Sequence, residues 1–327
     1  MVRSSTAEIR DALQRAEHDG TCLVFDDERL ARKLRRHVKS LDLVSPRRGM
    51  YARRTYWEGL SRDKRELHML RALKHMHPDW TFCSVSAAVA YGFDVPYDVL
   101  GQVHIASTRS QRQKKDRPTR THACGGAASY CRGGVTVVGV QETLFGCMRD
   151  IPFDCAVAIV DSALHKGLRI EDLARYLKNR CAHRKGIVRA RKVLAFADGR
   201  SESGGESRAR VMMAYLGFAA PDLQVSLADP MDAAQTYRCD FLWMLPSGGY
   251  IIGELDGSGK YQDAEMLGEK TTLRALTDER RRESRLTLYR VPIMRFSFDE
   301  VRHPEKLERL MRRFGVPRDQ TQPERVT

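Results

Sequence analysis

The sequence lacks any run of about 18 apolar residues, the length that a membrane-spanning helix needs. Its first residues, MVRSSTAEIRDALQ, are charged and contain no apolar stretch of the kind found in secretory signal peptides. Hydrophobic residues nevertheless make up 42% of the 327 residues, a proportion that argues against wholesale disorder. These features exclude membrane-spanning, secreted, collagen-like and coiled-coil-rod proteins. We expect a soluble, cytoplasmic α/β protein that is long enough for two or three domains.

Acidic residues are too few to balance the basic ones. The chain has 56 Lys and Arg residues against 42 Asp and Glu residues, which gives a formal net charge of +14. This excess favours a polyanionic partner, either nucleic acid or an anionic membrane surface.

The sequence also lacks the paired ligands of a structural zinc site. Its eight cysteines are dispersed, and neither a CxxC nor an HxxxH pattern occurs. His122, Cys124 and Cys131 lie close together in the sequence, but a structural zinc ion needs four ligands, usually arranged as two close pairs. We therefore interpret them as buried strand residues and expect free thiols.

Residues 1–56 have the element order of a winged helix. A capping-box pattern at Ser5 begins one helix, a short apolar stretch follows at residues 22–25, and Leu34 lies in a second, basic helix. Two short apolar segments around a Pro/Gly turn predict a hairpin over residues 41–51. In a winged helix the second helix enters the major groove and the hairpin contacts the DNA backbone. The basic residues of the second helix and the hairpin are therefore expected to bind DNA: Arg32, Lys33, Arg35, Arg36, Arg47 and Arg48. The alternative is that they form a solvated basic face with no DNA contact.

Residues 57–199 are interpreted as a middle α/β region. The expected helices cover residues 64–75, 142–148, 154–165 and 170–179, and the expected strands cover residues 103–107 and 135–140. The run from Arg109 to Arg120 is too polar for a core, and it is either a mobile loop over phosphates or an ordinary solvated loop. Nothing in this region indicates catalysis.

Roughly the first half of the chain, with Arg47-Arg-Gly-Met-Tyr-Ala52 followed by Ser84-Val-Ser-Ala-Ala88 and Gly92, resembles the first two domains of AbiEi-type antitoxin-like proteins. Their N-terminal winged helix is followed by a further domain. The resemblance implies a DNA-binding regulator module and a toxin as a partner protein.

The last third contains a predicted β-hairpin with acidic residues on both strands. The strands are expected over residues 238–245 and 250–256, on either side of a turn at 246–249. The turn length places Asp240 directly opposite Glu254 on one face. The other face is apolar and consists of Phe241, Trp243, Leu245, Ile251 and Leu255. A shift of one residue in the register would move Asp240 to that apolar face.

Asp256 shares the face of the other two acids, so three carboxylates crowd one end of the predicted sheet. Buried carboxylates repel each other and lose hydration, and a divalent cation such as Mg²⁺ relieves both costs. The alternative is a structural network in which Arg238, Lys260 or a later arginine neutralises the acids.

The element order after residue 200 is helix, strand, strand, strand, helix and strand. It resembles the PD-(D/E)XK nuclease fold, most closely the DUF559 group related to very-short-patch-repair endonucleases. The matching residues are Glu206, Gln224, Asp240-Phe241, Glu254-Leu-Asp-Gly, Glu279-x-x-Arg282-x-x-x-Leu286 and Arg295-Phe296. We expect this domain over residues 200–317, ending in an amphipathic helix and followed by a polar tail at 318–327.

The resemblance implies an endonuclease that hydrolyses phosphodiester bonds in double-stranded DNA with Mg²⁺ or Mn²⁺. The implied catalytic residues are Glu206, Asp240, Glu254, Asp256 and Lys260, and the implied metal ligands are Asp240, Glu254 and Asp256. Lys260 would position the attacking water or neutralise the transition state, and Arg282 would bind a phosphate.

One position departs from the nuclease pattern. The motif has Lys two residues after its second acid, where this chain has Asp256, and Lys260 stands where the DUF559 group tends to have His. Two alternatives therefore stay open. The first is a non-enzymatic DNA-binding regulator with a degenerate nuclease fold, and the second is a nuclease directed at RNA, while the DNA endonuclease stays the leading expectation.

Overall fold

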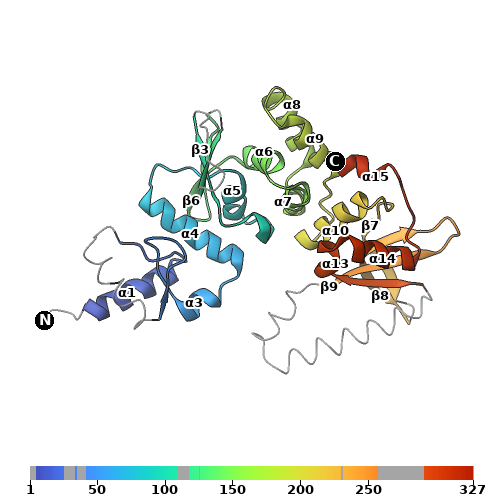
Figure 1. The fold of residues 1–327 in the computed structure, drawn as a ribbon, viewed down its shortest axis with the longest axis horizontal. Coiled ribbons are helices and arrows are strands. Elements are labelled where there is room, and N and C mark those ends of the chain that lie inside the picture. Colours follow the sequence, from blue (N-terminus) through green and yellow to red (C-terminus); the bar gives the residue numbers. More distant parts are fainter. Residues whose placement is uncertain are drawn as a thin grey trace. The chain divides into compact units, whose positions relative to one another are not determined.

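The computed structural model describes residues 5–25, 34, 42–108, 118–124, 126–229, 231–256 and 291–326. It is a mixed α/β protein that combines helices with several small sheets (Figure 1). The chain divides into two compact units, Met1–Ile151 and Pro152–Thr327. This division falls inside the predicted middle region, whereas the expected boundaries after residues 56, 199 and 317 stay predictions.

The first unit begins with a helix and a short hairpin. Helix α1 (Ser5–His18) precedes β1 (Leu43–Val44) and β2 (Ala52–Arg53), which pair antiparallel, and Leu23 forms an isolated bridge with Tyr51. These elements share one buried core, to which the helical residue Leu34 also contributes: Ile9, Leu13, Ala16, Leu23, Leu34, Leu43 and Tyr51. The apolar residues that recur at helical spacing in α1 therefore lie in the core, as expected.

The rest of the first unit joins two strand pairs to a group of helices. The helices are α3 (Arg54–Glu58), α4 (Arg62–Met76), α5 (Ser84–Ala90), the short 3-10 helix η1 (Tyr97–Val99) and α6 (Val140–Asp150). The strands are β3 (Val103–Ser107), which pairs parallel with β4 (Thr119–Ala123), and β5 (Ser129–Arg132), which pairs antiparallel with β6 (Val135–Val138). The buried Phe82 forms bridges to Ile105 and Val137, so it connects the two pairs.

The second unit places helices around a four-stranded sheet (Figure 1). Its first four helices are α7 (Phe153–His165), α8 (Ile170–Arg180), α9 (Ile187–Phe196) and α10 (Gly204–Tyr215). The strands are β7 (Asp222–Asp229), β8 (Asp232–Met244), β9 (Tyr250–Asp256) and β10 (Ile293–Ser297), and the last helices are α13 (Phe298–Arg302), α14 (Pro304–Phe314) and α15 (Gln322–Val326). The strand order is β10-β9-β8-β7, with β10 parallel to β9 and the other pairs antiparallel.

Each face of this sheet has its own apolar core. The first core unites Phe241, Trp243 and Ile251 with residues of α10 and α14. The second core contains Leu242 and Ile252, from the opposite face of the same strands. The predicted division of the hairpin into two faces is therefore confirmed.

The register of the hairpin is also as expected. Four pairs are formed, from Met244↔Tyr250 to Phe241↔Gly253. The glycine is needed at position 253, because a Cβ atom there would lie 2.8 Å from the Trp243 ring. The predicted pair of Asp240 and Glu254 lies one step beyond the last of these four pairs.

The segment predicted as a frayed polar tail is ordered over residues 318–326, which pack on the second unit. The Asp319 N–H donates to the Gly217 carbonyl at 3.0 Å, and Arg318 bridges to Phe218. Helix α15 then buries Gln322 and Val326 against the unit. The sequence did not indicate this helix, because two buried residues spaced four apart are too weak a helical pattern.

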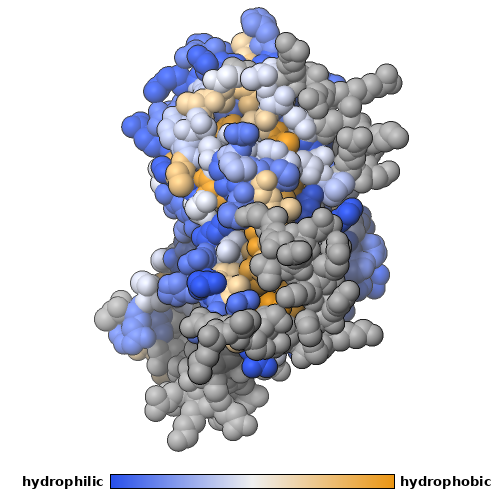
Figure 2. All heavy atoms as spheres, turned by 90° about the vertical axis from the view of Figure 1, so that its left-hand side faces the viewer, coloured by the Kyte–Doolittle hydropathy of each residue, from blue (hydrophilic) through white to orange (hydrophobic). Residues whose placement is uncertain are grey.

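Among the described helices, none has the length and apolar character needed to cross a membrane. On the face drawn in Figure 2, hydrophilic residues cover most of the described surface, and hydrophobic residues form small groups between them.

Candidate functional site

The start of α10 fixes the Glu206 carboxylate. Ser203 is the N-cap residue, and its Oγ accepts the Glu206 N–H at 3.2 Å. The same hydroxyl donates to Glu206 Oε1 at 2.8 Å, and the Glu202 N–H donates to Oε2 at 2.9 Å. Glu206 is thus held in the first helical turn, where the helix dipole favours a carboxylate.

The pairing of β7 with β8 is interrupted between Gln224 and Asp240. Gln224 has a φ of 53°, in the left-handed region that residues other than glycine seldom occupy. Its side chain donates from Nε2 to Glu206 Oε2 at 2.9 Å. A strained residue held by a buried carboxylate is typical of functional sites.

The interruption coincides with a twist of β8. Phe241 packs in the first core, whereas Cys239 packs in the second core. Residues two apart on a regular strand lie on the same face, so the strand twists at the residue between them. Asp240 is that residue.

The two acids of the hairpin have different partners. Asp240 Oδ2 accepts the Leu255 N–H at 2.9 Å. Glu254 is buried, and its Oε1 accepts the Tyr237 hydroxyl at 2.6 Å. The register predicted from the turn therefore brings Asp240 next to the Glu254–Leu255 segment. Asp256 follows at the exposed end of β9.

The carboxylates of Glu206 and Asp240 interact electrostatically. Burial raises the pKa of Glu206 above its ordinary value, and the negative charge of Asp240 raises it further, while the hydrogen bonds to Glu206 lower it. Burial likewise raises the pKa of the Cys239 thiol to about 12, with contributions from Glu254 and Asp240. A positive charge placed between Glu206 and Asp240 would relieve their repulsion.

The described residues contain no group of three or more His, Cys, Asp or Glu side chains that could hold a metal ion. Mg²⁺ is commonly bound by one or two carboxylates, with water and substrate phosphates completing its octahedron. Glu206 and Asp240, which lie close enough for the charge of Asp240 to raise the pKa of Glu206, fit this requirement. Arg238, one of the cations expected to neutralise the acids, pairs with Glu202 at 2.6 Å.

Several predicted site residues lie outside the described part of the chain. They are Arg32, Lys33, Arg35, Arg36, Lys260 and Arg282, together with residues 109–117 of the basic run.

The two arginines of the N-terminal hairpin differ in their surroundings. Arg48 is exposed, whereas Arg47 is half-buried and donates from Nη2 to Thr119 Oγ1 at 3.1 Å and to the Pro118 carbonyl at 3.3 Å. Burial raises the pKa of the nearby Glu66 to about 7, and the charge of Arg47 opposes this rise. Arg47 therefore anchors the hairpin within the first unit.

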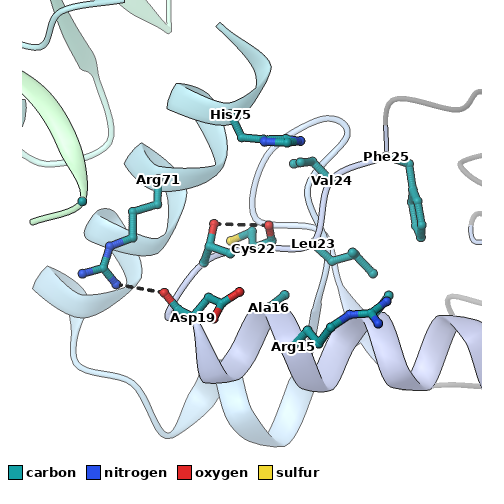
Figure 3. Close-up of a pocket in the computed structure, with 12 residues that line it drawn as sticks. Arg15, Ala16, Asp19, Cys22, Leu23, Val24, Phe25, Arg71 and His75 are labelled. Atoms are coloured by element: carbon teal, nitrogen blue, oxygen red, sulfur yellow. Dashed lines mark hydrogen bonds between the residues drawn. The ribbon is translucent and has the colours of Figure 1, made fainter. Parts of the chain in front are cut away.

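A cavity of about 790 Å³ opens in the first unit beside α1 and α4 (Figure 3). His75 points toward Val24 in this cavity, whereas Arg71 points toward Asp19, just after α1. The Arg71 guanidinium donates to the carbonyl groups of Gly20 at 2.8 Å and Gly133 at 2.7 Å. These bonds hold the turn after α1 in place, so we assign Arg71 a structural role.

His122 belongs to a buried polar network. Its Nε2 lies 3.0 Å from His104 Nδ1, and its Nδ1 lies 3.0 Å from Asp150 Oδ2. Burial lowers the pKa of His104 to about 3, which keeps this imidazole neutral. The expected burial is confirmed for His122 and Cys124 but is wrong for Cys131, which is exposed on β5. The described residues bring no three such ligands together.

Sequence reasoning missed two residues that hold the carboxylates. Ser203 could have been found, because Ser203 and Glu206 have the spacing of a capping box. No sequence pattern indicates the role of Tyr237, because its contact with Glu254 depends on the twist of β8.

Two curated proteins of Mycobacterium tuberculosis are similar to the chain. They are uncharacterized protein MT2308 of strain CDC 1551 / Oshkosh and uncharacterized protein Rv2248 of strain ATCC 25618 / H37Rv. Each is 30% identical over 194 residues, which is 58% of this chain and 67% of the relative. No family model and no solved structure matches the chain.

Proposed function

The chain belongs to the family of these two uncharacterized Mycobacterium tuberculosis proteins, and we propose that it is a Mg²⁺-dependent endonuclease acting on double-stranded DNA. One observation carries the proposal. Glu206 accepts a hydrogen bond from Gln224 and is influenced by the charge of Asp240, which in turn accepts the Leu255 N–H next to Glu254. These residues follow one another along α10, β7, β8 and β9 in the order that the PD-(D/E)XK resemblance requires. Mn²⁺ would substitute for Mg²⁺, because both prefer oxygen ligands.

The proposed metal ligands are Asp240 and Glu254, with Glu206 completing the acidic cluster and Asp256 as a further ligand or orienting group. A bound divalent ion supplies a nucleophilic water and stabilises the charge that develops on the scissile phosphate. Gln224 orients the Glu206 carboxylate through its hydrogen bond of 2.9 Å. Lys260 and Arg282 are proposed to contact the phosphate.

The N-terminal module is proposed to be a winged helix that targets the nuclease to DNA. Its support is the shared core of α1, Leu34 and the β1–β2 hairpin, with the exposed Arg48 at the turn. The same observation supports a second candidate function. In this alternative the protein is a cytoplasmic, antitoxin-like DNA-binding regulator with a toxin partner, and the carboxylates are structural.

The test is the nicking of supercoiled plasmid and the cleavage of linear single- and double-stranded DNA with Mg²⁺ or Mn²⁺. Cleavage should require the metal and disappear in Asp240→Asn and Glu254→Gln. Asp222→Asn is the matched control, because Asp222 is an exposed acid on the same sheet and should leave cleavage unchanged. Salt-sensitive DNA binding without metal-dependent cleavage would favour the regulator instead, and cleavage of RNA alone would redirect the proposal to that substrate.

A further inference from the structure

The helical hairpin α8–α9 carries an unusual concentration of positive charge. Residues 166–192 contain ten Lys and Arg residues against two acids, so this segment supplies more than half of the net charge of +14. We name the exposed cations of this hairpin the α8–α9 basic surface: Arg175, Lys178, Arg180, Lys185, Arg191 and Lys192.

Packing fixes which side of the hairpin faces solvent. Leu173, Leu177, Ala190 and Val193 are buried between the two helices and their neighbours. The cations of α8 and α9 occupy the intervening positions and are therefore displayed on the outside by the helical repeat, while Lys185 is exposed in the connection between the two helices. Because the buried residues hold both helices, the basic surface is rigid rather than a flexible charged tail.

Few of these cations are neutralised. Arg175 pairs with Asp172 at 3.1 Å. Within the described residues, Lys178, Arg180, Lys185, Arg191 and Lys192 form no ion pair. Five like charges without counterions repel one another, and a polyanion relieves this repulsion when it releases its own counterions.

We propose that the α8–α9 basic surface binds the phosphodiester backbone of DNA and is a second DNA contact, separate from the N-terminal module. A membrane surface fits less well, because an interfacial helix exposes a broad apolar face, whereas the exposed large apolar side chains of α8 and α9 are Ile170 and Val188, one on each helix. A protein partner fits less well too, because Lys, which supplies half of these cations, is depleted from protein interfaces.

The basic surface is joined firmly to the helix that carries Glu206. Arg210 of α10 donates to the carbonyl group of Phe196, the last residue of α9, at 3.4 Å and to Asp161 of α7 at 2.7 Å. The Asp198 N–H donates to the same Asp161 carboxylate at 2.7 Å. DNA held on α8–α9 is thus held on the same unit as the candidate carboxylate site.

The inference rests on the proposed function only for the choice of DNA as the polyanion. Its test is the binding of a fluorescent 30-base-pair duplex to the full chain, measured by anisotropy over a range of salt concentrations. The basic-surface variant combines Lys185→Gln, Arg191→Gln and Lys192→Gln. The matched control combines Arg309→Gln, Arg313→Gln and Arg325→Gln, which removes the same charge from exposed positions of α14 and α15.

The basic-surface variant should bind DNA at least about tenfold more weakly near 0.1 M salt, and its plot of log Kd against log salt should be shallower by about 2–3. The control should keep the wild-type slope. Both variants should keep the wild-type circular dichroism spectrum and Tm, since every altered side chain is exposed. A basic-surface variant with the wild-type slope, or a wild-type chain that binds phosphatidylserine vesicles but no DNA, would overturn the inference.

The outcome is independent of catalysis. If the wild type binds DNA through this surface but never cleaves it, the proposed nuclease fails and the inference stands. If the wild type cleaves DNA and the basic-surface variant binds and cleaves like the control, the inference fails and the nuclease stands.

Discussion

Replacing Arg210 with methionine should destabilise the second unit strongly. Arg210 Nη2 lies 2.7 Å from Asp161 Oδ2, and the two side chains are only 10% and 1% exposed. Burial raises the pKa of Asp161, and the charge of Arg210 is the largest influence that opposes this rise. In Arg210→Met the Asp161 carboxylate would be left buried without its cation.

The size of the expected destabilisation depends on the hydrogen bond and the packing that remain in Arg210→Met. Removing one partner of a buried ion pair costs about 3–5 kcal/mol. Asp161 retains the Asp198 N–H at 2.7 Å, and methionine retains apolar bulk near the Phe196 ring. We therefore expect the lower end of the range, about 3 kcal/mol. Adding Asp161→Asn removes the unpaired charge and keeps an acceptor for Asp198, so the double variant should recover about 1–2 kcal/mol.

The assay is urea unfolding followed by tryptophan fluorescence. Trp57→Phe and Trp80→Phe leave the buried Trp243 as the reporter of the second unit. With an m value of about 2–3 kcal/mol/M, Arg210→Met should lower the midpoint by about 1 M or slightly more. A loss of less than about 1 kcal/mol, or a double variant no more stable than Arg210→Met, would refute the reasoning.

Two further predictions concern buried acids. Burial raises the pKa of Glu66 to about 7, so the folded state binds a proton that the unfolded state has released between pH 4.5 and 7. The stabilising contribution is complete below that window and is lost as the pH rises through it, by up to about 1.4 kcal/mol per pH unit. Unfolding from pH 4.5 to 8 should show this loss in the wild type but not in Glu66→Gln, and parallel curves would contradict it. Tyr237→Phe removes the 2.6 Å hydrogen bond to Glu254 and should cost about 1.5–3 kcal/mol in urea unfolding. A cost below about 0.5 kcal/mol would show that Glu254 does not depend on this hydroxyl.

The elements with strong patterns could be predicted from the sequence. The strand expected at residues 103–107 coincides with β3, and the helix expected at 154–165 differs from α7 by one residue. The hairpin register was predictable because the length of the turn at 246–249 fixes which residues face each other.

The parts that could not be predicted depend on contacts between distant residues. The left-handed conformation of Gln224 follows from its contact with Glu206, and no local propensity favours it there. Asp161 and Arg210 are 49 positions apart, so neither their pairing nor their burial has a sequence signal. No sequence signal divides residues 57–199, whereas the contacts of α7, α8 and α9 place these helices in the second unit.

The most direct test of the carboxylate site is a count of bound Mn²⁺ by electron paramagnetic resonance on the full chain with a short uncleavable duplex. The wild type and the Asp222→Asn control should each bind Mn²⁺ tightly at the site, and Asp240→Asn should lose that binding. Equal Mn²⁺ binding by the wild type and Asp240→Asn, or none by either, would contradict the proposal that these carboxylates hold the metal for DNA cleavage.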